Sequence, residues 1–339
     1  MKTKLLLTFL LTTLLLSACS ARDLATLPPD VQSDIKGVIT DPSLTKDDKV
    51  EKVTDIVNGI VEDWPEIPIE DWDYEYNSEL GGVAITAYKG TETRIRFPDE
   101  INGDAVVSVA LACGYTSRPP SNNKRVTDVL IPNTVIEIGR SAFNNCDSLK
   151  SVTLPSGLQY IRQKAFFESG LTEITIPMGV THIEEKAFED CTELVSVSLP
   201  QSLVYIGVRA FTGSSKLIDI TLLADAVQVG ENAFGGTYWY ERQPDGLIIL
   251  GNVVVSYKGE IQDSTLVIPE GVVSIAGRIL YYSSYGDVNI TSVVFPASVT
   301  IIHNDAFNGW DLDDMTVESI WDINPYAEIA GDNWFTFYN

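Results

Sequence analysis

Apolar residues recur along most of the chain with a period of 22 or 23 residues. Pro132, Pro155, Pro177 and Pro200 mark this period and lie 23, 22 and 23 residues apart. Each unit carries the pattern LxxIxI before its proline, two more apolar positions after it, and an alanine–phenylalanine pair ten residues beyond it. Such a repeat predicts a solenoid, because no single unit can bury its apolar side chains without its neighbours. The Ala–Phe pairs are Ala142-Phe143, Ala165-Phe166, Ala187-Phe188, Ala210-Phe211, Ala233-Phe234 and Ala306-Phe307.

The repeat also predicts the conformation of each unit. Alternation of apolar and polar letters in LxxIxI is typical of a strand with one buried face. About seven apolar side chains per unit face inward, each contributing about 1.5–3 kcal/mol on burial. We therefore expect a β-rich repeat solenoid whose units stack on one another.

The full pattern LxxIxIPxxVxxIxxxAFxxC resembles the BspA-like leucine-rich repeat of bacterial surface proteins. The resemblance covers residues 74–325, including an insertion at 235–259, and residues 326–339 are expected to cap the stack. It implies a right-handed leucine-rich-repeat coil with one short strand per unit, stacked into a parallel sheet, and with the Ala–Phe turns along the opposite edge. It also implies a non-enzymatic, adhesin-like protein that attaches to an extracellular macromolecule.

The N-terminus has the layout of a secretory signal. Lys2 and Lys4 precede an apolar run at 5–16, which is too short to span a bilayer. The run ends in Leu-Ser-Ala-Cys, which resembles a bacterial lipobox. The resemblance implies that a signal peptide of residues 1–18 is removed and that Cys19 carries lipid, so that the protein is anchored in the cell envelope, at the outer membrane or cell surface.

Residues 19–73 differ in character from the repeats, being acidic and rich in proline. Val50, Val53, Val57, Ile60 and Trp64 are spaced as one stripe of a helix. We expect a short helical segment that tethers and caps the solenoid. A helical hairpin that binds a partner is the alternative.

Charge and motifs narrow the classes of function. With 47 acidic and 23 basic residues, the formal net charge is −24, which argues against nucleic-acid binding. His182 and His303 lie in different repeats, and no common catalytic motif is present. We therefore expect no catalytic residues, metal or cofactor. Cys113, Cys146 and Cys191 form no CxxC pair and are expected to be small buried residues.

Two groups of residues are candidates for recognition. The first is the solvent face of the predicted sheet, where hydroxyl and carboxylate side chains alternate with the buried residues. The same residue types also suit an exposed strand for solubility alone. The members of this group are Lys150, Ser151, Thr153, Thr172, Glu173, Thr175, Ser196, Ser198, Asp219 and Thr221.

The second group is aromatic and lies in and after the insertion. Exposed rings would suit a glycan or a protein hot spot, whereas buried rings would pack the insertion onto the coil. These residues are Tyr238, Trp239, Tyr240, Tyr281, Tyr282, Tyr285 and Trp310.

These patterns favour a monomeric surface lipoprotein that binds an extracellular protein or glycan through its solenoid. The alternative function is a structural or assembly component of an envelope complex, such as a glycan-uptake system, with no host ligand.

Overall fold

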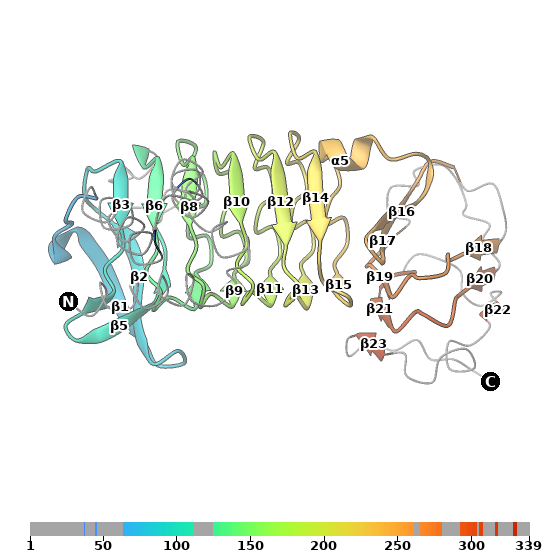
Figure 1. The fold of residues 1–339 in the computed structure, drawn as a ribbon, viewed down its shortest axis with the longest axis horizontal. Helices are drawn as coiled ribbons and strands as arrows, with labels where there is room; N and C mark the ends of the chain where they lie inside the picture. Colours follow the sequence, from blue (N-terminus) through green and yellow to red (C-terminus); the bar gives the residue numbers. More distant parts are fainter. Residues whose placement is uncertain are drawn as a thin grey trace.

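The computed structural model describes residues 64–111, 125–260, 265–279, 292–303, 305–307, 316–317 and 328–330, with the single positions 37 and 45. These residues form an elongated stack of β-strands (Figure 1). A regular first block extends from residue 72 to residue 240, and a second block follows from residue 246. The predicted β-rich repeat solenoid is thereby confirmed.

The strand before each proline forms what we call the front sheet. Its strands pair in parallel with a register of exactly one repeat, so that Glu173, Ser196 and Asp219 lie side by side. The pairing order is β3-β6-β8 and β10-β12-β14. The strands are β3 (Arg94–Arg96), β6 (Asp128–Leu130), β8 (Ser151–Thr153), β10 (Glu173–Thr175), β12 (Ser196–Leu199) and β14 (Asp219–Leu222).

A second strand in each repeat corrects the prediction of one strand per unit. After the proline turn, each repeat has a strand of two residues that pairs with the same strand of the neighbouring repeats. Together these strands form what we call the back sheet. This strand is too short to show alternation in the sequence, but its isoleucine, or the valine in β15, is buried in every repeat. The strands are β7 (Glu137–Ile138), β9 (Tyr160–Ile161), β11 (His182–Ile183), β13 (Tyr205–Ile206) and β15 (Gln228–Val229).

The Ala–Phe turns close the coil opposite the sheets. Their backbones continue the ladder, as when Phe188 N donates to Ala210 O at 2.7 Å. The rings of Phe143, Phe166, Phe188, Phe211 and Phe234 are buried and stack with centroids 5.0–5.5 Å apart and planes within 4–7° of parallel. We call this stack the phenylalanine spine.

Each of these turns has a left-handed residue directly before the alanine. Ser141, Lys164, Lys186, Arg209 and Asn232 have φ between 52° and 59°. Conformations of this kind cost L-residues about 1–2 kcal/mol each. The burial of Ala and Phe and the ladder hydrogen bonds on either side of the position offset that cost.

A β-hairpin opens each block. In the first block, β1 (Trp72–Asn77) and β2 (Gly82–Tyr88) pair antiparallel, and β2 then pairs parallel with β5 (Asp104–Val109). The insertion at 235–259 contains the same unit, because β16 (Gly246–Leu250) and β17 (Val253–Lys258) form a hairpin and β17 pairs parallel with β19 (Ser274–Ile275). Both second strands end in Tyr-Lys-Gly. The insertion is therefore a second opening unit and also carries the connection between the blocks.

The remaining elements complete the two blocks. A single 3-10 turn, η1 (Ile69–Asp71), precedes β1, and β4 (Glu100–Ile101) pairs antiparallel with β5. Strand β5 joins the back sheet by pairing with β7. The other elements are α5 (Tyr238–Glu241), β18 (Thr265–Val267), β20 (Ser292–Val294), β21 (Ile301–His303), β22 (Thr316–Val317) and β23 (Glu328–Ala330).

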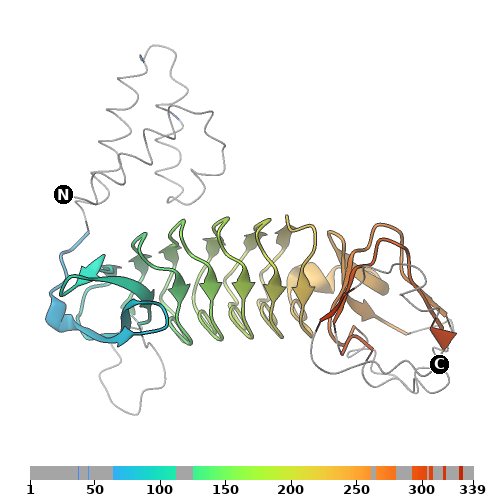
Figure 2. The same cartoon turned by 90° about the horizontal axis from the view of Figure 1, so that it is seen from below.

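The second block meets the free edge of the back sheet at β15. Ser274 Oγ donates to Val227 O at 2.7 Å, and Gly277 N donates to Val229 O at 2.9 Å. Figures 1 and 2 show the strands of the second block turned relative to those of the first. The solenoid therefore changes direction at this junction.

The predicted signal peptide, Cys19 and the predicted striped helix up to residue 63 lie outside the described residues. In the part of the chain that the structure covers, no helix is long and apolar enough to cross a membrane.

The cysteines differ from the expectation in one respect. Cys191 is a free, buried thiol, as expected of a small core residue. Cys146 is also buried but is disulfide-bonded, with its partner cysteine outside the described residues. The spacing of the cysteines in the sequence did not predict this bond.

Candidate functional site

The front sheet places the predicted polar residues in columns. Glu173, Ser196 and Asp219 form one column, and Thr175, Ser198 and Thr221 form the next. Because the isoleucine or valine between them is buried, both columns face solvent. The exposed members of the predicted group are Lys150, Thr172, Glu173, Ser196, Ser198, Asp219 and Thr221, while Ser151, Thr153 and Thr175 are half-buried.

A neighbouring column begins polar and becomes apolar. It starts with Lys150 and Thr172 and continues with Val195 and Ile218, whose backbones are joined by a 2.9 Å hydrogen bond from Ile218 N to Val195 O. Val195 is 46% exposed although it is aliphatic. These two residues were not predicted as site residues. The sequence could have indicated them, because they are apolar at a position that is polar in the preceding repeats.

The aromatic residues of the insertion do not form an exposed group of three, which agrees with the packing alternative for two of them. Trp239 packs edge-on against Phe234, the last ring of the spine, with centroids 6.0 Å apart. Tyr240 is buried, and its hydroxyl lies 3.3 Å from Ser256 Oγ. Only Tyr238 projects, being 49% exposed. The expected residues Tyr281, Tyr282, Tyr285 and Trp310 lie outside the described part of the chain.

Helix α5 brings Tyr238 to the end of the front sheet. Thr237 caps the helix by accepting a hydrogen bond from Tyr240 N at 3.1 Å. Trp239 N donates to Leu217 O at 2.8 Å, so the helix takes the place of the next rung. Figure 1 shows α5 directly beside the start of β14. Val195 and Ile218 therefore lie on adjacent repeats, and Tyr238 lies on the helix that follows them at the end of the front sheet. We call these three residues the apolar strip.

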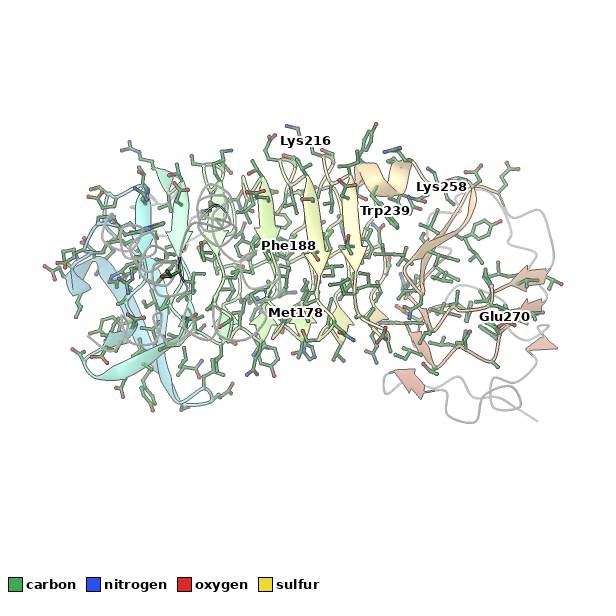
Figure 3. All side chains as sticks on the ribbon, in the orientation of Figure 1. Met178, Phe188, Lys216, Trp239, Lys258 and Glu270 are labelled. Carbon is green, nitrogen blue, oxygen red and sulfur yellow. The ribbon has the colours of Figure 1, made fainter. Side chains whose placement is uncertain are left out.

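Charged groups flank the apolar strip. The guanidinium of Arg242 lies over the Tyr238 ring, 5.6 Å from its centroid. Lys216, which projects from the edge of the stack in Figure 3, pairs with Glu193 at 2.7 Å, and this hydrogen bond lowers the pKa of Glu193. Within the described residues, Glu173 and Asp219 form no ion pair. The acidic column next to the strip is therefore free to meet an external cation.

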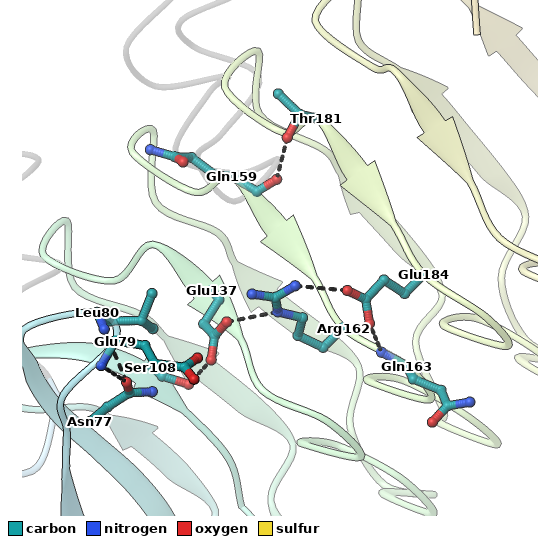
Figure 4. A network of polar contacts seen from close by, with 10 residues as sticks. All are labelled: Asn77, Glu79, Leu80, Ser108, Glu137, Gln159, Arg162, Gln163, Thr181 and Glu184. Carbon is teal, nitrogen blue, oxygen red and sulfur yellow. Dashed lines mark hydrogen bonds and ion pairs between the residues drawn. The ribbon is translucent and has the colours of Figure 1, made fainter. Parts of the chain in front are cut away.

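The outer face of the back sheet carries a different arrangement. His182 lies between Tyr160 and Tyr205, with ring centroids 5.5 and 5.9 Å away, and all three are half-buried. The planes of neighbouring rings are tilted by 36° and 42°. Arg162 lies over the Tyr160 ring and bridges Glu137 and Glu184 (Figure 4) at 2.7 and 2.8 Å. This network is stabilising, because its charges compensate one another.

The second histidine lies at the junction of the blocks. His303 Nδ1 contacts the Asp305 carboxylate, and Arg278 lies 3.4 Å from Glu231 Oε2 and 3.8 Å from Asp305 Oδ2. Burial alone would raise the pKa of Asp305, but the hydrogen bond and charge of His303 and the charge of Arg278 outweigh it and lower the pKa. We call Glu231, Arg278, His303 and Asp305 the junction cluster.

Neither histidine has the surroundings of a catalytic group among the described residues. His182 Nδ1 lies 2.9 Å from the hydroxyl of Thr181 but has no carboxylate partner there, and His303 has a carboxylate but no hydroxyl or thiol partner there. In the same part of the chain, no three His, Cys, Asp or Glu side chains are grouped as metal ligands. Cys191 is no nucleophile either, because burial raises the pKa of its thiol to about 12.

Sequence comparison agrees with this architecture. Six copies of the BspA type leucine-rich repeat region match residues 121–239 and 258–327, which is more than half of the chain. The protein therefore belongs to the BspA-type leucine-rich repeat family, whose members are repeat scaffolds. The matched ranges stop at α5 and resume at the end of β17, so the second opening hairpin lies between them.

Solved structures of several bacterial leucine-rich repeat proteins are similar to this chain. A leucine-rich repeat protein of Treponema pallidum is 27% identical, with a TM-score of 0.40, over 52% of this chain and 90% of that chain. A leucine-rich cell surface protein of Faecalibacterium prausnitzii is 20% identical, with a TM-score of 0.47, over 80% of this chain and 96% of that chain. A leucine-rich repeat protein of Bacteroides ovatus is 20% identical, with a TM-score of 0.40, over 70% and 71% of the two chains. No functionally curated protein matches.

Proposed function

We propose that this protein is a non-enzymatic lipoprotein of the cell envelope that binds an extracellular macromolecule through its front sheet. The observation that carries the proposal is the register of that sheet, which aligns exposed hydroxyl and carboxylate side chains into columns beside the apolar strip. An extended, regular face of this kind suits a macromolecule better than a small substrate.

Two features support export. Leu-Ser-Ala-Cys at residues 16–19 follows a basic and then apolar leader, as in a lipoprotein signal. The disulfide at Cys146 is a bond that persists in oxidising compartments and is rare in the cytosol. Acylation of Cys19 with two or more chains would anchor the protein stably at a membrane.

Protease treatment of intact cells tests whether the protein reaches the surface. We expect the full chain to be cleaved on intact cells and to be released from the membrane fraction by a Cys19→Ser substitution. Complete protection until the envelope is broken would contradict the adhesin-like function. It would favour the alternative, an assembly component with no host ligand.

Binding to a panel of immobilised matrix proteins and glycans tests the front sheet. We expect Glu173→Lys with Asp219→Lys to change binding at least about tenfold, because both carboxylates face the ligand. The matched control is Glu75→Lys with Asp104→Lys, which reverses two exposed carboxylates on β1 and β5. Equal effects of both pairs would show that net charge alone acts, and would contradict a site on the front sheet.

A further inference from the structure

We infer that the partner of the front sheet is a protein segment with aliphatic side chains flanked by lysine or arginine, docked at the end formed by β12, β14 and α5. This inference rests on the proposed function and names the chemistry of its ligand.

The apolar strip provides the anchor for such a segment. Val195 and Tyr238 are 46% and 49% exposed, Ile218 is half-buried, and the columns of hydroxyl and carboxylate side chains lie beside them. Partly exposed apolar side chains at one end of a sheet favour association, because water is released from them on docking. Tyrosine is also among the residues that most often carry the energy of a protein interface.

The charge around the strip selects a cationic partner. Asp219 directly follows Ile218 in the chain, and Glu173 lies two rungs away in the same column as Asp219. Neither forms an ion pair within the described residues, whereas Glu193 is already paired with Lys216. With a net charge of −24, the molecule also repels acidic partners at long range.

The same residues argue against a glycan as the ligand. A sugar ring is recognised by the flat face of an aromatic ring, and the exposed ring that the described residues place at this end of the front sheet, Tyr238, has Arg242 over it. Trp239 packs against Phe234 and Tyr240 is buried, so they offer no second platform. Aliphatic Val195 and Ile218 instead suit the aliphatic side chains of a polypeptide.

Selection of short random peptides on the immobilised full chain tests the inference. We expect the enriched peptides to combine Lys or Arg with Val, Ile or Leu, and to bind more weakly as salt is added. Val195→Ser, Tyr238→Ser and Asp219→Lys should each weaken such a peptide at least about tenfold. The controls Val204→Ser, Tyr76→Ser and Asp104→Lys alter residues that are similarly exposed, at 52% for Val204 and 61% for Tyr76, but lie on β1, β5 or beside β13.

The outcomes separate this inference from the proposed function. Enrichment of acidic or uncharged peptides, or equal losses in site and control variants, would overturn the inference. Retention of a glycan by the full chain that the three site variants abolish would also overturn it. If charge reversal on the front sheet alters binding to the panel but Val195→Ser and Tyr238→Ser do not, the proposed function stands and the inference fails. Protection of the chain from protease on intact cells would contradict the proposed function. Peptide binding would still test whether the apolar strip is a docking site.

Discussion

Single residues in this protein are defined by the rung they occupy. In each of the five regular turns, the residue directly before the alanine adopts a left-handed conformation, although none of these five residues is a glycine. The polar residues of the front sheet face outward because the apolar residues next to them are buried in the core of every repeat. The surroundings of Cys191 are likewise set by the neighbouring repeat, since its thiol donates to Phe166 O at 3.0 Å and lies 3.4 Å from Ser169 Oγ within the core.

The Cys191 thiol should be inert in the folded protein. Burial raises its pKa to about 12, so the reactive thiolate is scarce at neutral pH. We expect a thiol reagent to leave Cys191 unmodified in native protein and to modify it after denaturation without reductant, with peptide mapping by mass spectrometry as the measurement. Cys191→Ala should abolish that label. Rapid labelling of native Cys191 would contradict its place in the core.

At the scale of elements, the phenylalanine spine links the repeats. Trp239 ends the spine by packing edge-on against Phe234, so α5 serves as a cap and displays Tyr238 at the same time. The alanine–phenylalanine period predicted a turn at the same position of each repeat, and the structure shows that the rings at this position stack on one another. The back sheet was not predicted, because its two-residue strands are defined only by pairing with neighbouring rungs.

Removing one ring from the spine should destabilise the stack. Phe188→Ala leaves a cavity between Phe166 and Phe211, and such losses typically cost about 3–5 kcal/mol. Urea unfolding followed by circular dichroism measures the change. Val204→Ala, at an exposed position of the neighbouring repeat, should cost less than about 1 kcal/mol. An equal loss of unfolding free energy in the two variants would mean that the rings of the spine are not closely packed.

At the scale of the whole molecule, two blocks meet at an angle. Each block has its own opening hairpin, and the junction cluster joins them where β19 reaches the edge of β15. Gly277 belongs to this contact, because a Cβ there would lie 2.6 Å from Asp305 Oδ1 and 3.0 Å from Glu231 N. A side chain at this position would push the blocks apart.

The junction cluster should contribute stability that depends on pH. Asp305 has a lowered pKa in the folded protein, so its contribution is present above the unfolded pKa of about 3.9 and is lost as the pH falls through the lower folded value. We expect Asp305→Asn to reduce the free energy of unfolding by about 1–2 kcal/mol at neutral pH, allowing for partial exposure, and by less near pH 3. Urea unfolding at both pH values, with Asp104→Asn as control, measures the difference. A constant difference at both pH values would contradict an ionic role.

The sequence by itself determined the repeat, the solenoid, the inward columns and the outward hydroxyl and carboxylate columns, because a fixed period forces identical slots into contact. Only the tertiary structure decided which aromatic residues are buried, which cysteine is bridged, and that α5 follows the repeats of Val195 and Ile218 at the end of the front sheet. Those outcomes depend on where an irregular segment packs, and an insertion carries no period from which its neighbours could be deduced. The change of direction at the junction has the same origin, since it arises where the repeat is broken and a second hairpin begins the stack again.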